Sequence, residues 1–292
     1  DSIVKIKDNS YSNNSFDIYH AVYLNNYNTH YSNIQKAIDL AEPKMDVNIY
    51  PGNYTENIVV NKSLDVHGLE DIEEVIIYGN SNTPAFLIAP DSEVNDFFIE
   101  DLTISGGNHS LKTGIYQDVS GLIVSDCIIR NPQKGYAVYI DPHNFSDESS
   151  ARPGTDIFED AVDFSYCKIT GGFYYQYWPY EVYTATIDNQ LVLRYNEIDN
   201  MFLNGSVSVL IKDNIIGSLG MMYSRDIEIS DNTFENPWET LYGIYLWSIN
   251  GTPDVGNIII TDNTILEYDR LGILIAGAYD VTITKNDIRA CL

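Results

Sequence analysis

Two groups of side chains in the middle of the sequence have the types and spacing that could act on a glycan. Two carboxyl groups at a suitable separation suffice for glycoside hydrolysis, one as general acid and the other as base or nucleophile. Aromatic rings can stack on sugar rings in a binding groove. The candidate catalytic residues are Glu159, Asp160 and Asp163, and the candidate carbohydrate-binding residues are Tyr174, Tyr175, Tyr177, Trp178 and Tyr180.

Each group also has a purely structural interpretation. An acidic chain contains carboxylate clusters by default, and sequence spacing does not show whether the carboxyl groups face one another. An aromatic loop can equally pack on the body of the protein or on another subunit. The sequence therefore leaves both the catalytic and the binding interpretation open.

The charge balance narrows the range of partners. The 292 residues include 42 acidic and 16 basic side chains, giving a net charge of −26. Such a chain repels nucleic acid and anionic membrane surfaces, so we expect neither as a partner. No apolar run approaches the roughly 20 residues that cross a bilayer, and we expect no membrane insertion.

Seven glycosylation sequons favour an exported glycoprotein; they begin at Asn13, Asn53, Asn61, Asn108, Asn144, Asn204 and Asn250.

A repeated pattern organises the last two thirds of the chain. The pattern is apolar, any, apolar, any, any, Asn, any, apolar, and Ile227, Ile229, Asn232 and Phe234 are one example. Alternating apolar residues indicate a strand that buries one face, and the amide position marks a bend into a second strand. The key position falls at Leu102, Cys127, Cys167, Asn196, Asn214, Asn232, Asn263 and Asn286.

Repeats of variable length around a fixed bend are typical of a solenoid. Stacked coils place equivalent residues about 4.8 Å apart, so successive inward Asn side chains can hydrogen-bond to one another. We therefore predict a parallel β-helix, an all-β fold, with a structural ladder at Cys127, Cys167, Asn196, Asn214, Asn232, Asn263 and Asn286.

The three cysteines exclude several metal and redox motifs, because none forms a Cys-x-x-Cys pair. Cys127 and Cys167 share the key position of the repeat, so we expect them to stack inside the coil. They are either small buried apolar residues or a disulfide between coils. Cys291 is either free or paired with another molecule.

The repeat resembles the parallel β-helix repeats of the pectate-lyase-like superfamily, and this resemblance implies a right-handed coil. The N-terminal order of helix, strand, Pro51-Gly52-x-Tyr54-x-Glu56 and strand resembles the cap of pectinesterase-like and archaeal cell-surface β-helix proteins, including those related to disaggregatase. The resemblance implies a microbial, archaeal cell-surface protein. Catalytic motifs of polygalacturonases are absent, and those of pectin esterases are incomplete. Lyases of the superfamily often use calcium. The resemblance therefore leaves calcium as a possible cofactor, and we expect no other.

The chain divides into an N-terminal polar arm, residues 1–31, and a β-helix, residues 32–292. Ser32-Asn33-Ile34-Gln35 matches a capping box and opens a predicted capping helix over 32–43. The arm contains possible strands at 3–6 and 21–24, and either lies along the solenoid or reaches a neighbouring subunit. A loop of about residues 141–190 interrupts the repeat. His67 is interpreted as a turn or packing residue.

The last repeat reaches almost to Leu292 without a visible cap. Because an open coil exposes strand edges and apolar core, we expect self-association through this end and through the N-terminal arm. A head-to-tail filament is one form that such self-association can take. The sequence thus predicts an extracellular cell-surface β-helix glycoprotein with a structural or adhesive role that self-assembles or binds matrix polysaccharide. The alternative is a glycoside hydrolase or polysaccharide lyase acting on cell-wall glycan.

Overall fold

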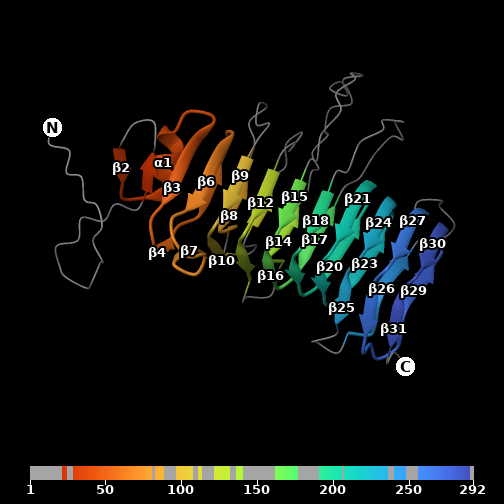
Figure 1. Ribbon diagram of the computed structural model, residues 1–292. Coiled ribbons are helices and arrows are strands. Elements are labelled where there is room, and N and C mark those ends of the chain that lie inside the picture. Colours follow the sequence, from red (N-terminus) through yellow and green to blue (C-terminus); the bar gives the residue numbers. More distant parts are fainter. Residues whose placement is uncertain are drawn as a thin grey trace, which may run out of the picture.

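Three long sheets wind around one apolar core (Figure 1). The computed structural model describes residues 22–24, 29–80, 83–88, 97–107, 111–113, 122–131, 136–140, 162–176, 191–205, 207–235, 240–247 and 256–289. Each full coil contributes one strand to each sheet in a fixed order, and neighbouring coils pair in parallel. This confirms the predicted parallel β-helix, and the sheet order is consistent with a right-handed coil.

Sheet A has 12 strands and contains the first strand of every coil. Its strands, in spatial order, are β2 (Thr29–Tyr31), β1 (Val22–Leu24), β3 (Met45–Ile49), β6 (Leu64–Gly68), β9 (Phe97–Glu100), β12 (Leu122–Ser125), β15 (Val162–Ser165), β18 (Leu191–Arg194), β21 (Val207–Lys212), β24 (Arg225–Ser230), β27 (Gly256–Thr261) and β30 (Tyr279–Thr284).

Sheet B has 10 strands and follows sheet A across the bend that carries the key position of the repeat. Its strands are β4 (Gly52–Thr55), β7 (Val75–Gly79), β10 (Thr103–Gly106), β13 (Ile128–Arg130), β16 (Lys168–Thr170), β19 (Glu197–Ile198), β22 (Ile215–Ile216), β25 (Thr233–Glu235), β28 (Thr264–Leu266) and β31 (Asp287–Arg289).

Sheet C has 9 strands and closes each coil. Its strands are β5 (Ile58–Val60), β8 (Phe86–Ile88), β11 (Leu111–Thr113), β14 (Val138–Ile140), β17 (Phe173–Gln176), β20 (Met201–Asn204), β23 (Leu219–Met222), β26 (Tyr242–Trp247) and β29 (Leu271–Ala276).

Period-two alternation builds the core, as the sequence predicted. In β24, Ile227 and Ile229 are at most 2 % exposed, while Glu228 between them is exposed. The register places Ile229 beside Ile211 of β21 and Ile260 of β27, so equivalent residues stack along the solenoid. Stacked aliphatic columns of this kind bury apolar surface in every coil, which is the main stabilising contribution to the fold.

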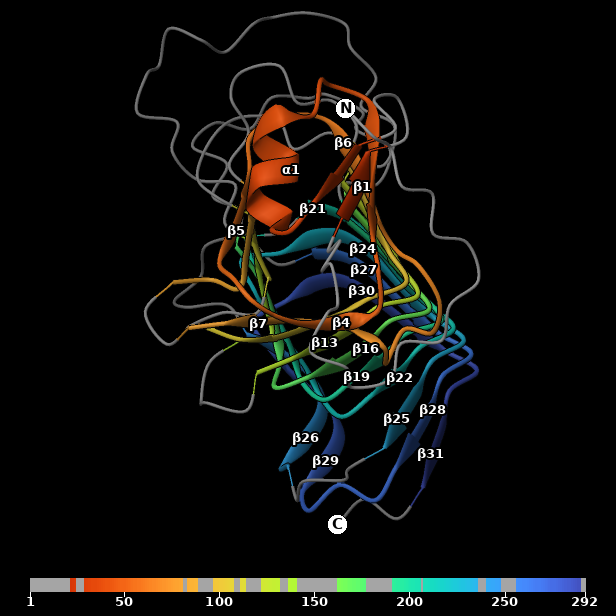
Figure 2. The ribbon, with the colours of Figure 1, turned by 90° about the vertical axis from the view of Figure 1, so that its left-hand side faces the viewer.

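A short helix covers the N-terminal opening of the coil (Figure 2). The helix α1 spans Ile34–Leu40 and buries Ile34, Ala37 and Ile38 against the core. The predicted helix over 32–43 was too long, and Ser32 is not its cap: Asn33 is the N-cap, and its side chain accepts from the Lys36 amide at 2.8 Å.

The sequence pattern Pro51-Gly52-x-Tyr54-x-Glu56 has a structural role at this cap. The Glu56 carboxylate accepts from the backbone amides of Ile34 and Gln35, each at 3.1 Å, and so satisfies two free donors at the helix N-terminus. The Tyr54 hydroxyl donates to the Tyr50 carbonyl at 2.6 Å, and burial raises the pKa of Tyr54 to about 12. The motif therefore fastens the capping helix to the first coil.

The described part of the N-terminal arm belongs to the chain's own sheet. Strand β1 pairs antiparallel with β3 and with β2, which extends sheet A by a hairpin. Val22 and Leu24 are fully buried. The predicted strand at 21–24 therefore exists as β1, whereas the one at 3–6 lies outside the described residues.

The region expected to form one inserted loop contains a complete coil. Strands β15, β16 and β17 occupy residues 162–176, and Phe173 is fully buried, so the prediction of a single loop over 141–190 was wrong there. The connections 141–161 and 177–190 each lead from sheet C to sheet A and lie outside the described residues. No helix in the described part of the chain is long and apolar enough to cross a membrane.

Candidate functional site

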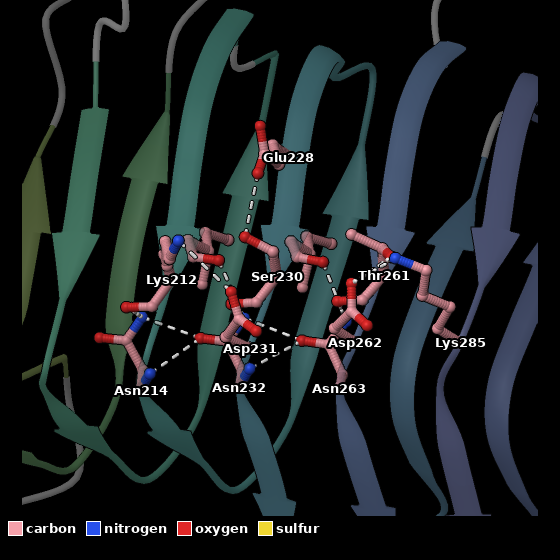
Figure 3. Close-up of polar contacts among 12 residues, drawn as sticks. Lys212, Asn214, Glu228, Ser230, Asp231, Asn232, Thr261, Asp262, Asn263 and Lys285 are labelled. Carbon is pink, nitrogen blue, oxygen red and sulfur yellow. Dashed lines mark hydrogen bonds and ion pairs between the residues drawn. The ribbon is translucent and has the colours of Figure 1, made fainter.

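An uninterrupted ladder of asparagine amides lines the bend between sheets A and B (Figure 3). Asn232 shows the pattern: its Nδ2 donates to Asn263 Oδ1 of the next coil at 3.0 Å, to the Ile211 carbonyl of the previous coil at 2.8 Å and to the Ser230 carbonyl at 2.9 Å. Its Oδ1 accepts from the backbone N–H of Asn214 at 2.9 Å and from Asn214 Nδ2 at 3.0 Å. The same bonds to the next coil are made by Asn196, Asn214 and Asn263, and the ladder ends at Asn286.

Residues in the left-handed region of the backbone make this bend possible. The residue before the key position has a φ between 47° and 59° in every repeat, and it is usually Asp. A non-glycine side chain adopts this conformation at a cost, and Asp does so more readily than most. These residues are Asp101, Asp126, Tyr166, Tyr195, Asp213, Asp231, Asp262 and Lys285.

Cys127 and Cys167 occupy the same bend as buried, free thiols. Of the two readings of the sequence, the structure therefore shows small buried residues and no disulfide between them. Burial, followed by a hydrogen bond with Cys167, raises the pKa of the Cys127 thiol well above its usual range. A reactive cysteine has a depressed pKa instead, so Cys127 is not of that kind. Cys291 lies outside the described residues.

A row of aromatic rings runs along the outer face of sheet C. Tyr139 of β14 stacks on Tyr174 of β17 with ring centroids 5.0 Å apart, and Tyr174 stacks on Phe202 of β20 at 5.7 Å. Tyr245 of β26 continues the row, with its centroid 6.5 Å from Phe202. We call Tyr136, Tyr139, Tyr174, Phe202, Tyr242 and Tyr245 the aromatic row.

The parallel register creates this row. Tyr139, Tyr174 and Phe202 are direct partners on successive strands, and the next partner is Gly220 of β23. A Cβ on Gly220 would lie 2.3 Å from the Tyr245 hydroxyl, so the glycine gives Tyr245 room to lean back toward Phe202. Without that glycine, a side chain would separate Tyr245 from the other rings.

An open, mainly apolar pocket of about 600 Å³ adjoins the row. Trp247 and Leu241 at its border are 49 % and 45 % exposed, which leaves apolar surface accessible. Its lining residues are Ser218, Thr240, Leu241, Tyr242, Tyr245, Leu246, Trp247, Leu274 and Ala276. Aromatic surface beside a concave apolar pocket is a common setting for a ligand.

Two phenol groups of the row, those of Tyr136 and Tyr245, have a raised pKa. Burial, and then the neighbouring Tyr174, raise the pKa of Tyr136; burial, and then Tyr136, raise the pKa of Tyr245. A protonated phenol both donates and accepts hydrogen bonds. The row therefore offers apolar ring faces together with hydroxyl groups suited to a polyhydroxylated ligand.

The predicted carbohydrate-binding residues lie only partly in this row. Tyr174 is at its centre. Tyr175 lies on β17, but its side chain is not among those that the structure describes, and Tyr177, Trp178 and Tyr180 lie outside the described residues. Sequence reasoning missed the other members of the row. A signal was present, because each of four aromatic residues is the middle of an apolar–aromatic–apolar triplet on a strand of sheet C, namely Tyr139, Tyr174, Phe202 and Tyr245.

The candidate catalytic carboxylates are elsewhere. Asp163 is half-buried on the outer face of β15 in sheet A, where its Cα partners are Ile123 and Val192. Glu159 and Asp160 lie outside the described residues, so no carboxylate pair is defined there. Asp163 and the aromatic row thus belong to different sheets.

The sequons differ in exposure. Asn53 and Asn61 are exposed, as a glycan acceptor must be, whereas Asn204 on β20 is only 9 % exposed. Asn13, Asn108, Asn144 and Asn250 lie outside the described residues. Glycosylation therefore stays a prediction, best placed at Asn53 and Asn61.

One further group escaped the sequence analysis. Asp46, Asp65 and His67 bring potential metal-ligand atoms within 4.8 Å of one another on sheet A. His67, expected to be a turn or packing residue, is not in a turn but lies half-buried within β6. The alternation of β6 indicates that Asp65 and His67 share one face, but their proximity to Asp46 depends on the pairing of β3 with β6.

The three sheets and the ladder define a parallel β-helix repeat protein. Residues 165–291 match the model of the family described as periplasmic copper-binding protein (NosD). The matched residues include all five asparagines of the ladder. A search of curated proteins gave no match to the chain.

Proposed function

We propose that this protein is an adhesive β-helix protein of the cell exterior, which binds polysaccharide along the aromatic row. The observation that carries the proposal is the continuity of the row over strands β14 to β26, with neighbouring centroids from 4.7 to 6.5 Å apart. A linear polymer can contact several rings at once, and multiple weak contacts then add up to useful binding.

The charge of the chain selects among glycans. With a net charge of −26, the protein repels polyanionic polysaccharides at low ionic strength. A neutral polysaccharide avoids this repulsion and still presents the apolar faces and hydroxyl groups that the row can contact. Neutral glycans are therefore the proposed ligand class.

The family match supports an extracytoplasmic location, since its description is periplasmic. Copper binding by the matched segment is not supported by its residues. Residues 165–291 contain no histidine, and the described residues there include no group of three His, Cys, Asp or Glu side chains placed to share an ion. Imidazole, thiolate and thioether groups are the usual protein ligands of copper, and the described residues of this segment offer only the buried Cys167, Met201 and Met221 and the half-buried Met222. The proposal for these coils accordingly involves no metal.

Affinity electrophoresis in gels containing neutral soluble glucans, mannans or galactans tests the proposal. Tyr174→Ala and Tyr245→Ala should each weaken retardation by about tenfold in Kd, or about 1.4 kcal/mol, because each removes a stacking surface. Tyr174→Phe keeps the ring and should retain most binding. The matched control is Tyr78→Ala, which removes a half-buried tyrosine from β7 in sheet B.

Equal binding by wild type and both row variants would overturn the proposal, as would a loss equally large in Tyr78→Ala. Sedimentation velocity on the same samples measures self-association, which stays a prediction and would raise apparent affinity by avidity. It is favoured by the core-type residues Ile275, Ile283 and Ile288, which are 38 %, 41 % and 45 % exposed in the last two described coils. Release of reducing ends from a retained glycan would favour the alternative, a glycan-degrading enzyme.

A further inference from the structure

The group formed by Asp46, Asp65 and His67 lies on the outer face of sheet A, near the capped end of the solenoid. Met45 and Val47 flank Asp46 and point into the core, as Leu64 and Val66 do around Asp65, so the two carboxylates face outward. The register makes Asp46 and Asp65 direct Cα partners on β3 and β6.

His67 joins these carboxylates because it lies two residues after Asp65 on the same face of β6. All three side chains are half-buried, and their ligand atoms lie within 4.8 Å of one another. An ion that binds its ligands at about 2.0–2.2 Å needs donor atoms no more than about 4.4 Å apart. Small side-chain rotations therefore suffice to place all three donors around one ion.

A second observation, independent of the group itself, concerns the imidazole. His67 Nδ1 lies 2.6 Å from Glu100 Oε1 on β9, the strand of the next coil. When Nδ1–H donates to this carboxylate, the lone pair is on Nε2, where a metal can bind it. A carboxylate that orients a metal-binding imidazole in this way is the usual outer partner of histidine ligands.

The local charge also favours a cation. Asp46 and Asp65 are like charges in direct cross-strand positions, an arrangement that destabilises a sheet. Acidic groups thus crowd this end of sheet A, and a divalent ion would offset their repulsion.

We propose that Asp46, Asp65 and His67 form a binding site for one first-row divalent transition-metal ion, with Glu100 as the residue that positions the imidazole. The mixed nitrogen and oxygen donor set favours such an ion over calcium, which takes six to eight oxygen ligands. The ion would join β3 to β6 and so hold together the first two coils beneath α1. This site lies outside the segment matched by the family model.

Titration calorimetry of the chelator-treated full chain with Zn²⁺ tests the site. The wild type should bind one ion, and Asp65→Asn and His67→Gln should each weaken binding at least tenfold. Glu100→Gln should weaken it by about tenfold, the usual effect of removing an outer partner of a ligand. The matched control is Glu228→Gln, in the same outward row of sheet A but six coils away from Asp65, and it should leave binding unchanged.

Thermal unfolding provides a second readout that separates metal binding from a folding defect. Zn²⁺ should raise the midpoint of the wild type and of Glu228→Gln but not of Asp65→Asn. Without metal, Asp65→Asn should unfold no earlier than the wild type, because it removes a like-charge pair. With Cu²⁺ as a paramagnetic probe, hyperfine coupling to one nitrogen should be present in the wild type and absent in His67→Gln.

Three results would overturn the proposal. One is absence of Zn²⁺ binding by the wild type; another is binding that survives both Asp65→Asn and His67→Gln. The third is binding of Ca²⁺ at least as tight as that of Zn²⁺, which would exclude the imidazole as a determining ligand.

Discussion

The same bend is built in two ways along the solenoid. From Asn196 to Asn286 the key position carries amides that bond from coil to coil, whereas Leu102, Cys127 and Cys167 hold it in the preceding coils. The backbone is alike in both regions, with a left-handed residue before the key position. The comparison shows that the backbone conformation and an inward side chain suffice for the bend, and that the amides add bonding between coils.

The cysteine coils reproduce part of the amide chemistry. Cys167 Sγ lies 3.2 Å from the Ser165 carbonyl and 3.5 Å from the Val124 carbonyl. These are the carbonyl positions that an asparagine Nδ2 reaches in the later coils, as Asn232 shows with Ser230 and Ile211. A thiol is a weak donor and has no counterpart of Oδ1, so the bond to the preceding coil is missing.

The largest expected effect comes from breaking the ladder in its middle. Asn232→Leu removes five hydrogen bonds and leaves buried donors and acceptors on Asn214, Ile211 and Ser230 without that partner. At about 1–3 kcal/mol for each unsatisfied buried group, the free energy of unfolding should fall by about 4 kcal/mol or more. Urea denaturation measures it. Asn286→Leu, at the half-exposed end of the ladder, is the control and should cost less, because water replaces its bonds. Equal losses would show that ladder position does not matter.

An intermediate effect is expected from extending the ladder into the cysteine region. Cys167→Asn should stabilise the protein by about 1 kcal/mol, because Asn196 Oδ1 already accepts from the Cys167 amide at 2.9 Å and can accept from the new Nδ2 as well. Leu102→Asn lies at the same bend but farther from the amides. It should destabilise the protein by about 1–3 kcal/mol, because the new buried amide would have no ladder amide in the next coil to bond with. Thermal unfolding of both variants checks the contrast. A destabilisation by Cys167→Asn as large as that of Leu102→Asn would contradict it.

The smallest effect is expected where the two regions are alike. Asp126→Gly and Asp231→Gly should each change the free energy of unfolding by less than about 1 kcal/mol, because glycine adopts the left-handed conformation without strain but gains entropy when unfolded. The two changes should agree with each other. Asp231→Val serves as the contrasting variant and should cost about 1–2 kcal/mol, since a β-branched residue resists this conformation. A large difference between the two glycine variants in denaturation would mean that the turns are not equivalent.

The parts of the fold that depend on local pattern were predictable from sequence. Ile227 and Ile229 alternate with outward residues, and Asn232 recurs at equivalent places, so strand, bend and ladder followed from spacing. Strand β17 was missed because its aromatic residues read as a binding loop, although Phe173 is in the core. The cap was misplaced by one residue because Ser32 and Asn33 are both favourable N-cap residues, and the sequence alone does not choose between them.

The sites were harder to predict because they depend on register between coils. Asp46 meets Asp65 only through the pairing of β3 with β6, and Tyr139 meets Tyr174 only through the pairing of β14 with β17. The connections between coils vary in length, so sequence separation does not reveal which outward residues become neighbours. The sequence shows that each outward residue is polar or aromatic, but it does not show which residue of the neighbouring coil lies beside it.

The direction of the hydrogen bonds has a mechanical consequence. In all three sheets and in the ladder, the bonds between coils run along the solenoid axis, while the covalent chain winds around it (Figure 1). A pulling force along the axis therefore acts on the bonds between coils, and the chain lengthens only where two coils part. Coils joined through amides resist such a load with two extra bonds per step, as between Asn214 and Asn232. The step from Cys127 to Cys167 has neither amide bond, and the step from Cys167 to Asn196 keeps only the bond from the Cys167 backbone N–H to Asn196 Oδ1. Under tension the solenoid should therefore unwind in the cysteine region first, while its C-terminal coils stay wound.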